Sequence, residues 1–381
     1  MTQVQLEKFV HYLQKENWLV FGPVQSSEVS AKTIEEISPY LIAHQMPKIP
    51  KKEKGLVLIK QIQNPSELLL NECLPFFSFK RFFVPEGETL FEYQGTKLKS
   101  FLYFPPLVKG GEGGFKKIAL LGVNILDLKA VNLYDQVFGK DPYYQARRRN
   151  ILIIGHSLVP EIEDNIFEYK YEEDILEHLP FDIFLVNSNP PTPLLKGGTG
   201  GVKVFSGSIK GQRILEHFGY KNYQHIQFSG PVNPHTKFGV GVKEGEPEER
   251  MVLLRDKLKN HHNQKMWDEL GKRCIECGKC TIVCPTCFCF RIDDYAGLED
   301  RSGARQRCWD SCYYQEFSEV AGGGKFLRNT AQRIHFWYFH KFARIPDEFD
   351  FMGCVGCHRC TAVCPVGIDI AEVLKNIENS Q

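Results

Sequence analysis

The stretch CIECGKCTIVCPTCFC, from Cys274 to Cys289, places six cysteines within sixteen residues. Its first four cysteines and the proline after them have the spacing C-x-x-C-x-x-C-x-x-x-C-P, which returns near the end of the sequence. The first quartet consists of Cys274, Cys277, Cys280 and Cys284, and the second quartet consists of Cys354, Cys357, Cys360 and Cys364. A repeated quartet with this spacing indicates that the fold of this region is organised around two metal centres.

The spacing is typical of proteins that hold two [4Fe–4S] clusters. Three thiolates separated by two-residue gaps can converge from one tight loop, whereas the fourth begins an outgoing helix and serves the other cluster. We therefore expect one cluster on Cys274, Cys277, Cys280 and Cys364, and a second cluster on Cys354, Cys357, Cys360 and Cys284. Zinc is the weaker interpretation, because structural zinc sites use two C-x-x-C pairs or mixtures of cysteine and histidine.

Five cysteines are not needed for two clusters. Cys308 and Cys312 are spaced by one helical turn, so these two could form a third metal site with Cys287 and Cys289. A reversible thiol pair, or packing as small apolar side chains, would explain the same four residues. The fifth, Cys73, stands alone in the first 273 residues, and we expect it to be an inert core residue.

The composition is that of a soluble globular protein with room for two domains. The chain has 381 residues, of which 43% are hydrophobic, and its formal net charge of +1 gives no indication of binding to nucleic acid. No apolar run approaches the roughly 18 residues of a membrane span, and the first residues lack the features of a secretory signal. The clustering of cysteines argues against a secreted disulfide scaffold. We expect a cytoplasmic protein.

The sequence pattern predicts an α+β fold with two domains. Residues 1–247 have the alternating strands and helices of a mixed α/β domain, and residues 248–381 indicate an α-helical two-cluster ferredoxin domain. The expected strands cover residues 55–62, 117–125, 151–157 and 181–187, and Asp127 is the expected N-cap of a helix over 127–138. One helix over residues 244–273 should lead to Cys274, and the last helix should begin at Asp369.

Two Gly/Pro-rich segments, near residues 105–117 and 190–204, resemble each other. Neither contains the Lys-Ser or Lys-Thr pair of a phosphate-binding P-loop, so we interpret both as surface insertions.

The sequence between the quartets is predicted to be helical and carries several basic residues. These are Arg328, Arg333, His335, His340, Lys341 and Arg344. Because each cluster carries net negative charge, such residues could offset that charge and raise the reduction potential. The alternative is a solvated basic helix face.

Several segments together resemble the β subunit of cytoplasmic sulfhydrogenase. They are RCIECGKCTIVCPTCFCF (273–290), RQRCWDSC (305–312), HKF (340–342) and CVGCHRCTAVCPVGIDI (354–370). The same 4Fe–4S dicluster family includes one of the subunits of anaerobic sulfite reductase. Upstream, SFKRFFVPEGETLFEY (78–93) and DPYYQARRRNILIIG (141–155) resemble the N-terminal domain of the hydrogenase β subunit. The chain departs from that pattern at NILD (124–127) and after residue 155, where relatives tend to carry cysteines.

The resemblance implies an electron-transfer subunit that performs no bond chemistry itself. It would relay electrons between a flavin subunit that handles NAD(P)H and a catalytic subunit of the nickel–iron hydrogenase or sulfite reductase kind. A different hypothesis is a catalytic reductase in which the spare cysteines reduce a disulfide or sulfur compound. A third is a binding module whose metal is purely structural.

Overall fold

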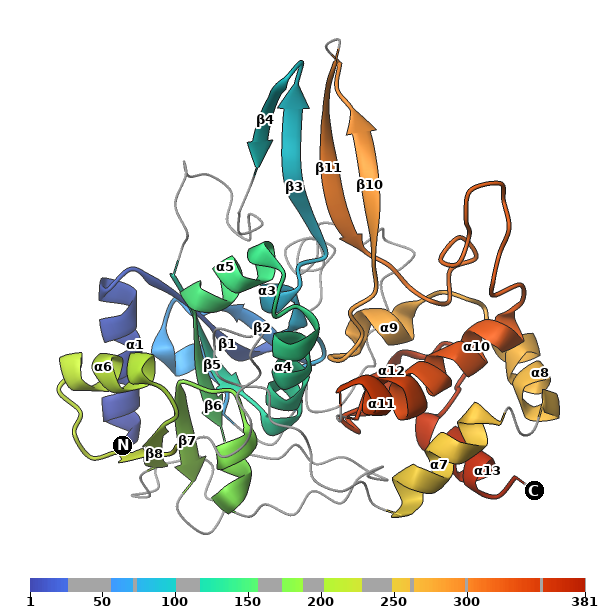
Figure 1. Ribbon diagram of the computed structural model, residues 1–381. Helices are drawn as coiled ribbons and strands as arrows, with labels where there is room; N and C mark the ends of the chain where they lie inside the picture. The colour runs from blue at the N-terminus through green and yellow to red at the C-terminus, as the bar shows by residue number, and fades with distance from the viewer. Residues whose placement is uncertain are drawn as a thin grey trace.

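The computed structural model describes most of the chain (Figure 1). The described residues are 1–26, 56–70, 74–100, 117–156, 173–187, 202–227, 249–260, 264–298, 301–349 and 352–380. Cys73, most of both Gly/Pro-rich segments and the expected domain boundary at residue 247 lie outside these ranges. The fold class is confirmed: an N-terminal mixed α/β region is followed by a largely helical C-terminal region.

A seven-stranded sheet forms the centre of the N-terminal region, with strand order β2-β1-β5-β6-β7-β8-β9. The strands are β1 (Trp18–Ser26), β2 (Leu56–Gln61), β5 (Lys117–Val123), β6 (Ile151–His156), β7 (Ile183–Asn187), β8 (Val202–Ser206) and β9 (Gln224–His225). Neighbours among β1, β5, β6 and β7 are parallel, whereas β2 and β8 join antiparallel. Parallel strands buried on both faces have nearly continuous apolar sequences, which explains why ILII and IALL predicted strands.

Helices cover both faces of this sheet. On β5, Ile118 and Leu120 belong to one core, and Ala119 and Leu121 belong to the other, as the two-residue period of a strand requires. The first core includes α3 (Lys80–Phe83), α4 (Ile125–Val137) and α5 (Pro142–Asn150), and the second includes α1 (Gln3–Lys15) and α6 (Ile209–His217). The N-cap of α4 is Asn124 rather than the expected Asp127, because the Asn124 side chain accepts the Asp127 N–H at 2.9 Å.

A second, antiparallel sheet joins the two halves of the sequence in the order β10-β11-β3-β4. Its strands are β3 (Gly87–Gln94), β4 (Lys97–Ser100), β10 (Phe290–Ala296) and β11 (Ser302–Trp309). Figure 1 shows this sheet extending away from the rest of the molecule. The prediction that the sequence between the quartets is helical was therefore wrong for residues 285–298 and 301–329. β11 pairs with β3, more than 200 residues earlier, and local sequence does not reveal so distant a partner.

The C-terminal region contains the remaining helices. They are α7 (Glu249–Lys259), α8 (Gln264–Arg273), α9 (Lys279–Val283), α10 (Thr330–Phe339), a π-helical segment (His340–Arg344), α11 (Ile345–Phe349), α12 (Arg359–Val363) and α13 (Ile370–Glu378). Two helices, α7 and α8, stand where one helix was expected over 244–273. The last helix begins as predicted, with Asp369 accepting the N–H groups of Ala371 and Glu372. Among the described residues, every helix is too short or too polar to span a lipid bilayer.

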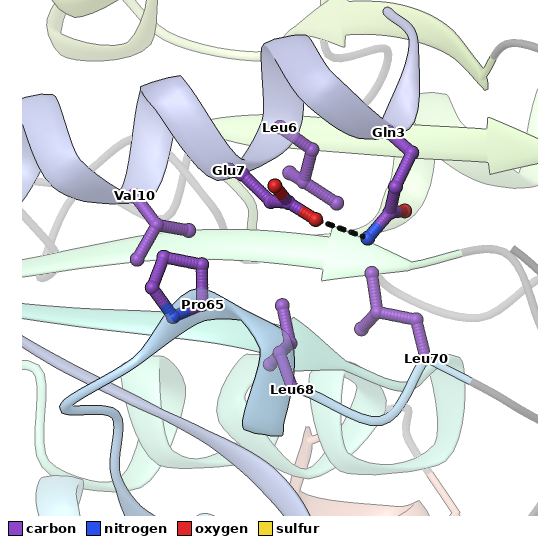
Figure 2. Close-up of a pocket in the computed structure, with 7 residues that line it drawn as sticks. All are labelled: Gln3, Leu6, Glu7, Val10, Pro65, Leu68 and Leu70. Atoms are coloured by element: carbon purple, nitrogen blue, oxygen red, sulfur yellow. Dashed lines mark hydrogen bonds between the residues drawn. The ribbon is translucent and has the colours of Figure 1, made fainter. Parts of the chain in front are cut away.

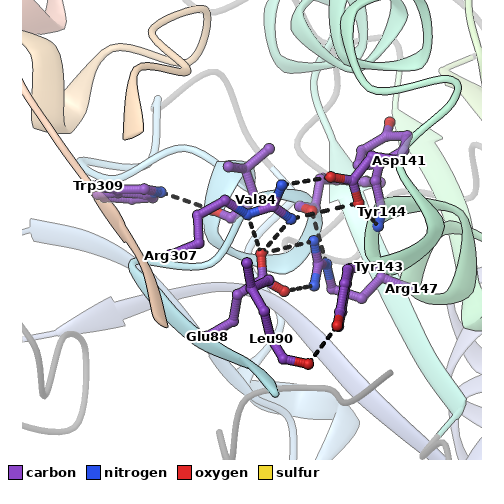
Figure 3. Close-up of polar contacts among 10 residues, drawn as sticks. Val84, Glu88, Leu90, Asp141, Tyr143, Tyr144, Arg147, Arg307 and Trp309 are labelled. Atoms are coloured by element: carbon purple, nitrogen blue, oxygen red, sulfur yellow. Dashed lines mark hydrogen bonds and ion pairs between the residues drawn. The ribbon is translucent and has the colours of Figure 1, made fainter. Parts of the chain in front are cut away.

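A buried ionic network connects α5, β3 and β11 (Figure 3). Arg147 and Arg307 both donate to the carboxylate of Glu88, and Arg147 Nε also donates to the carbonyl oxygen of Phe83 at 3.0 Å. Arg307 forms a further ion pair with Asp141. Each of three segments that resemble the hydrogenase β subunit, 78–93, 141–155 and 305–312, contributes to this network. Their shared role is thus to hold the second sheet against the α/β region.

Candidate metal centres

The two cysteine quartets adopt the same unusual backbone. The first has positive φ at Glu276 (56°) and Gly278 (68°), and the second has positive φ at the corresponding residues Gly356 (66°) and His358 (51°). Each left-handed turn folds the C-x-x-C-x-x-C loop back on itself, and the short helices α9 and α12 begin directly after these loops. These two helices pack against each other. The repeat seen in the sequence is therefore also a repeat of conformation.

Backbone N–H groups point at the first sulfur of each quartet. The Glu276 N–H lies 3.4 Å from Cys274 Sγ, and the Gly356 N–H lies at the same distance from Cys354 Sγ. Hydrogen bonds of this kind stabilise a thiolate and are typical of cysteines that ligate iron–sulfur clusters. The loop conformation of the protein alone thus directs backbone N–H groups at the sulfur atoms of Cys274 and Cys354.

The first cavity is lined by Cys274, Cys277, Cys280 and Cys364 and has about 510 Å³ of empty volume, part of it open to solvent. Three of these thiols come from the first quartet, and the fourth comes from the second quartet. The structure thus brings together the residues expected for one cluster. Whether they ligate iron remains a prediction.

The second cavity is lined by Cys354, Cys357, Cys360 and Cys284 and has about 290 Å³ of empty volume, including space open to solvent. Here three thiols come from the second quartet and one from the first. Cys360 also borders the first cavity, as does Trp337, so the two cavities adjoin each other. Apart from the shared Cys360, the arrangement reciprocates that of the first cavity.

The kind and spacing of these donors fit clusters better than single ions. A structural zinc ion takes two C-x-x-C pairs or a mixture of cysteine and histidine, whereas each quartet here has the spacing C-x-x-C-x-x-C-x-x-x-C-P. In a cubane cluster each cysteine binds a different iron, so three thiolates from one loop and one from another can share one cluster.

Two unsatisfied groups support the same conclusion. Trp337 Nε1 and His358 Nε2 are buried and have no hydrogen-bond partner among the described residues, and both side chains line the second cavity. Buried polar groups in native proteins are almost always satisfied. The sulfides and thiolates of a cluster in the cavity would supply acceptors.

Lys341 is the charged residue of the second cavity. Its side chain is 2% exposed, and Nζ donates to Cys284 Sγ at 3.3 Å, to Thr286 Oγ1 at 2.9 Å and to the carbonyl oxygen of Gly353 at 2.8 Å. Burial acts to lower the pKa of Lys341, but the neighbouring Cys284 and Cys287 raise it well above its ordinary value. The side chain is therefore a fixed cation against the Cys284 sulfur.

Cys287 is one of the spare cysteines and interacts with a predicted ligand. A hydrogen bond from its thiol, together with the charges of Lys341 and Lys80, holds the pKa of Cys284 well below its ordinary value, even though burial opposes this. The same hydrogen bond raises the pKa of Cys287. By contrast, burial raises the pKa of Cys354 to about 12 in the absence of metal. Cys284 is thus prepared as a thiolate by the protein itself.

The other spare cysteines do not share the helix face that the hypothesis of a third metal site assumed. Cys308 lies on β11 and Cys312 lies in the turn that follows, so the expected shared helix face does not exist. Burial raises the pKa of Cys289 to about 11 and raises that of Cys312 well above its ordinary value. Cys312 belongs to the hydrophobic core of the helical region, and Cys287 packs against the same core. The packing interpretation fits these residues best, and we do not propose a third metal site.

Of the six basic residues singled out in the sequence, Lys341 contacts a quartet sulfur and Arg333 contacts a quartet loop, through Glu276. Arg344 forms an exposed ion pair with Glu348, and Arg328 is exposed. The two histidines pack against aromatic rings, His335 on Trp267 and His340 on Phe288. The charge-offset hypothesis therefore applies to Lys341, whereas Arg344 and Arg328 have the solvated environment of the alternative.

The sequence analysis missed two residues that join the helical region to the α/β region. Arg359, in α12, forms a bidentate ion pair with Asp127, at 2.7 and 3.2 Å, and both side chains are buried. Lys80, in α3, donates to the carbonyl oxygens of Thr281 and Cys287 at 3.1 and 3.2 Å. Both contacts end on residues within or just after the quartets, in α12, in α9 and at Cys287, so the α/β region holds the two quartets in place.

Gly278 is a position where the loop conformation can be tested. A Cβ there would lie 2.7 Å from the Tyr314 ring, and its φ of +68° is strained for other residues by about 1–2 kcal/mol. Gly367 has a similar φ of +65°, but a Cβ there would have nothing within 4 Å. We expect Gly278→Ala to lower the thermal midpoint of the metal-loaded protein more than Gly367→Ala does. Equal midpoints would contradict the packing argument.

A third cavity carries no comparable chemistry. It lies between α1 and the segment around Pro65 and is lined mainly by Leu6, Val10, Leu68 and Leu70 (Figure 2). Its polar contact is a hydrogen bond from Gln3 to Glu7, two residues of α1. Its lining contains neither cysteine nor histidine, and its one carboxylate, that of Glu7, accepts the hydrogen bond from Gln3.

Two adjoining cavities, one lined by Cys274, Cys277, Cys280 and Cys364 together with Cys360 and the other by Cys354, Cys357, Cys360 and Cys284, form the arrangement expected of an iron–sulfur protein. In agreement, residues 273–368 match the family of the 4Fe-4S dicluster domain. The chain is also 27% identical, over 335 residues, to the sulfhydrogenase 2 subunit beta of Pyrococcus furiosus. This similarity covers 86% of the chain and 91% of that relative, which confirms the expected resemblance. No solved structure matches the chain.

Proposed function

We propose that this chain is an electron-transfer subunit that carries two [4Fe–4S] clusters within a soluble oxidoreductase complex of the sulfhydrogenase type. The observation that carries this proposal is the pair of adjoining cavities, which share Cys360 and are otherwise lined by reciprocal sets of cysteines. When bound, such clusters accept and release single electrons at potentials set by their surroundings. The protein itself supplies the thiolates, the N–H donors and the charge of Lys341.

The proposed ligands of the first site are Cys274, Cys277, Cys280 and Cys364. The proposed ligands of the second site are Cys354, Cys357, Cys360 and Cys284. The left-handed turns of both loops and the contact between α9 and α12 support this crossed assignment. Each fourth cysteine ends one of these short helices, as the C-cap of α9 or α12, and lines the cavity of the opposite quartet.

We further propose two partners for the chain: a flavin subunit that oxidises NAD(P)H, and a catalytic subunit of the hydrogenase or reductase type. The similarity to a chain named as a sulfhydrogenase subunit supports the existence of such partners. The alternative, a catalytic reductase that uses the spare cysteines, has no comparable support. Cys312 is 2% exposed, and the pKa values of Cys287, Cys289 and Cys312 are raised, so these thiols are poor nucleophiles.

Metal analysis of anaerobically purified protein tests the proposal. We expect about eight irons and about eight sulfides per chain, two reducible centres in a dithionite titration, and no catalytic turnover by the isolated chain. Zinc in place of iron, or about four irons with a single reducible centre, would contradict it. Co-purification of the untagged chain with a flavoprotein would support the proposed partner.

A further inference from the structure

The two sites differ in their electrostatics, and this difference bears on how the proposed relay operates. The inference rests on the proposed function, because it concerns the relative reduction potentials of two bound clusters. It begins with Lys341, whose three hydrogen bonds hold the ammonium group 3.3 Å from Cys284 Sγ. All three donors are used, so the charge cannot swing away into solvent.

Lys341 lacks a conventional counter-charge. Among the described residues it forms no ion pair with a carboxylate within 4.0 Å, and its acceptors are a sulfur, a hydroxyl and a carbonyl oxygen. A buried cation without an anion is strongly unfavourable. The group that can balance it is the Cys284 thiolate with the negatively charged cluster that this thiolate would bind. Lys341 is therefore placed to stabilise added negative charge at the second site.

Further groups around the second site also favour added negative charge there. The Lys80 ammonium, itself buried, donates to the backbone carbonyl oxygen of Cys287, three residues after Cys284. His358 Nε2 is buried without a partner among the described residues, and its side chain lines only this cavity of the two. Arg359 contributes little net charge, because Asp127 neutralises it.

The first site has no equivalent of Lys341 among the described residues. Lys279 borders its cavity but is half-exposed, and Arg273, which donates to the carbonyl oxygen of Gly367 nearby, is exposed. Water screens such charges far more than it screens a buried one. Glu276, in the loop of the first quartet, adds a negative charge that Arg333 offsets. As whole residues, Cys284 and Cys357 of the second site are buried, whereas the four cysteines of the first site are partly exposed.

We propose that Lys341 makes the second site, on Cys354, Cys357, Cys360 and Cys284, the one with the higher reduction potential. Buried positive charge and hydrogen bonds to sulfur favour the reduced, more negative state of a cluster. The first electron that enters the chain from the external donor therefore resides at the second site. When transfer occurs between the sites, the electron lost at the first is the one gained at the second, and no further reactant is required.

A redox titration of the metal-loaded, full-length protein, followed by electron paramagnetic resonance, tests the proposal. We expect two one-electron steps in the unchanged protein. In Lys341→Met, the step at higher potential should move to more negative potential while the lower step stays in place. Lys279→Met, which removes a half-exposed lysine at the first cavity, should leave the higher step unchanged. A shift of the lower step in Lys341→Met, or no shift of either, would overturn the proposal.

Two further measurements keep the test decisive if Lys341→Met loses metal. Thr286→Val removes the hydroxyl that lies 3.2 Å from Cys284 Sγ and accepts from Lys341 Nζ, without replacing a proposed ligand, so it should move the higher step in the same direction by a smaller amount. In the unchanged protein reduced by one electron, a soluble paramagnetic relaxing agent should broaden the signal weakly, because Cys284 and Cys357 of the second site are buried residues and the four cysteines of the first site are partly exposed. Strong broadening at that stage would place the first electron at the first site. Iron content near four would instead refute the proposed function itself.

Discussion

Replacing Cys284 with alanine should abolish the centre of the second cavity and preserve the centre of the first, although Cys284 belongs to the first quartet. Cys284 lines the second cavity with Cys354, Cys357 and Cys360. Its loss removes one of four ligands and leaves the ammonium of Lys341 buried without its anion. We expect iron and sulfide to fall by about half, from about eight to about four each.

The spectra of companion variants show which centre is lost. The signal that remains in Cys284→Ala should match the one that remains in Cys357→Ala. Likewise, the signal that remains in Cys364→Ala should match the one that remains in Cys277→Ala. Cys312→Ala is the matched control, because Cys312 is a buried cysteine that lines neither cavity, so both centres should persist. If the spectrum of Cys284→Ala coincided with that of Cys277→Ala, each quartet would hold its own cluster and the crossed assignment would be wrong.

The sequence predicted the features that depend on local pattern. The quartets are short-range signals, since the conformation of each loop is set within seven residues by positions such as Gly278 and Gly356. The strands β5 and β6 were equally clear, because strands buried on both faces are almost entirely apolar. The cap at Asp369 was predicted from a single residue type and its spacing. In each case the residues that determine the local structure lie within a few positions of it in the sequence.

The features that were missed depend on contacts between distant segments. The hairpin β10-β11 has a surface rich in charged residues and is a strand pair because β3 binds its edge. Arg359 and Asp127 are separated by 232 positions, and neither has a neighbouring residue that would reveal the other. Lys341 was one of six basic residues in the sequence, and only the fold distinguishes it from the exposed Arg344. Long-range pairing of this kind leaves no periodic trace in a single sequence.

Replacing Glu88 with alanine should destabilise the protein more than any other change to the contacts between its two halves. Glu88 is 6% exposed and accepts hydrogen bonds from both Arg147 and Arg307 (Figure 3). Its removal leaves Arg147 without a carboxylate and Arg307 with Asp141 alone. Removing one partner of a buried ion pair typically costs about 3–5 kcal/mol. Anaerobic urea unfolding, followed by tryptophan fluorescence, would measure the change.

The control for Glu88→Ala lies on the same sheet. Asp294→Asn removes an exposed carboxylate that pairs with Arg305, and exposed pairs contribute little, so the urea midpoint should hardly move. A second comparison separates charge from packing. If uncompensated arginine charge causes the loss, then Glu88→Leu combined with Arg147→Met and Arg307→Met should recover much of it, because apolar residues of similar size can replace a buried ionic group. A triple variant as unstable as Glu88→Ala would show instead that the network holds β11 and β3 in register through its directional hydrogen bonds, which apolar side chains cannot supply.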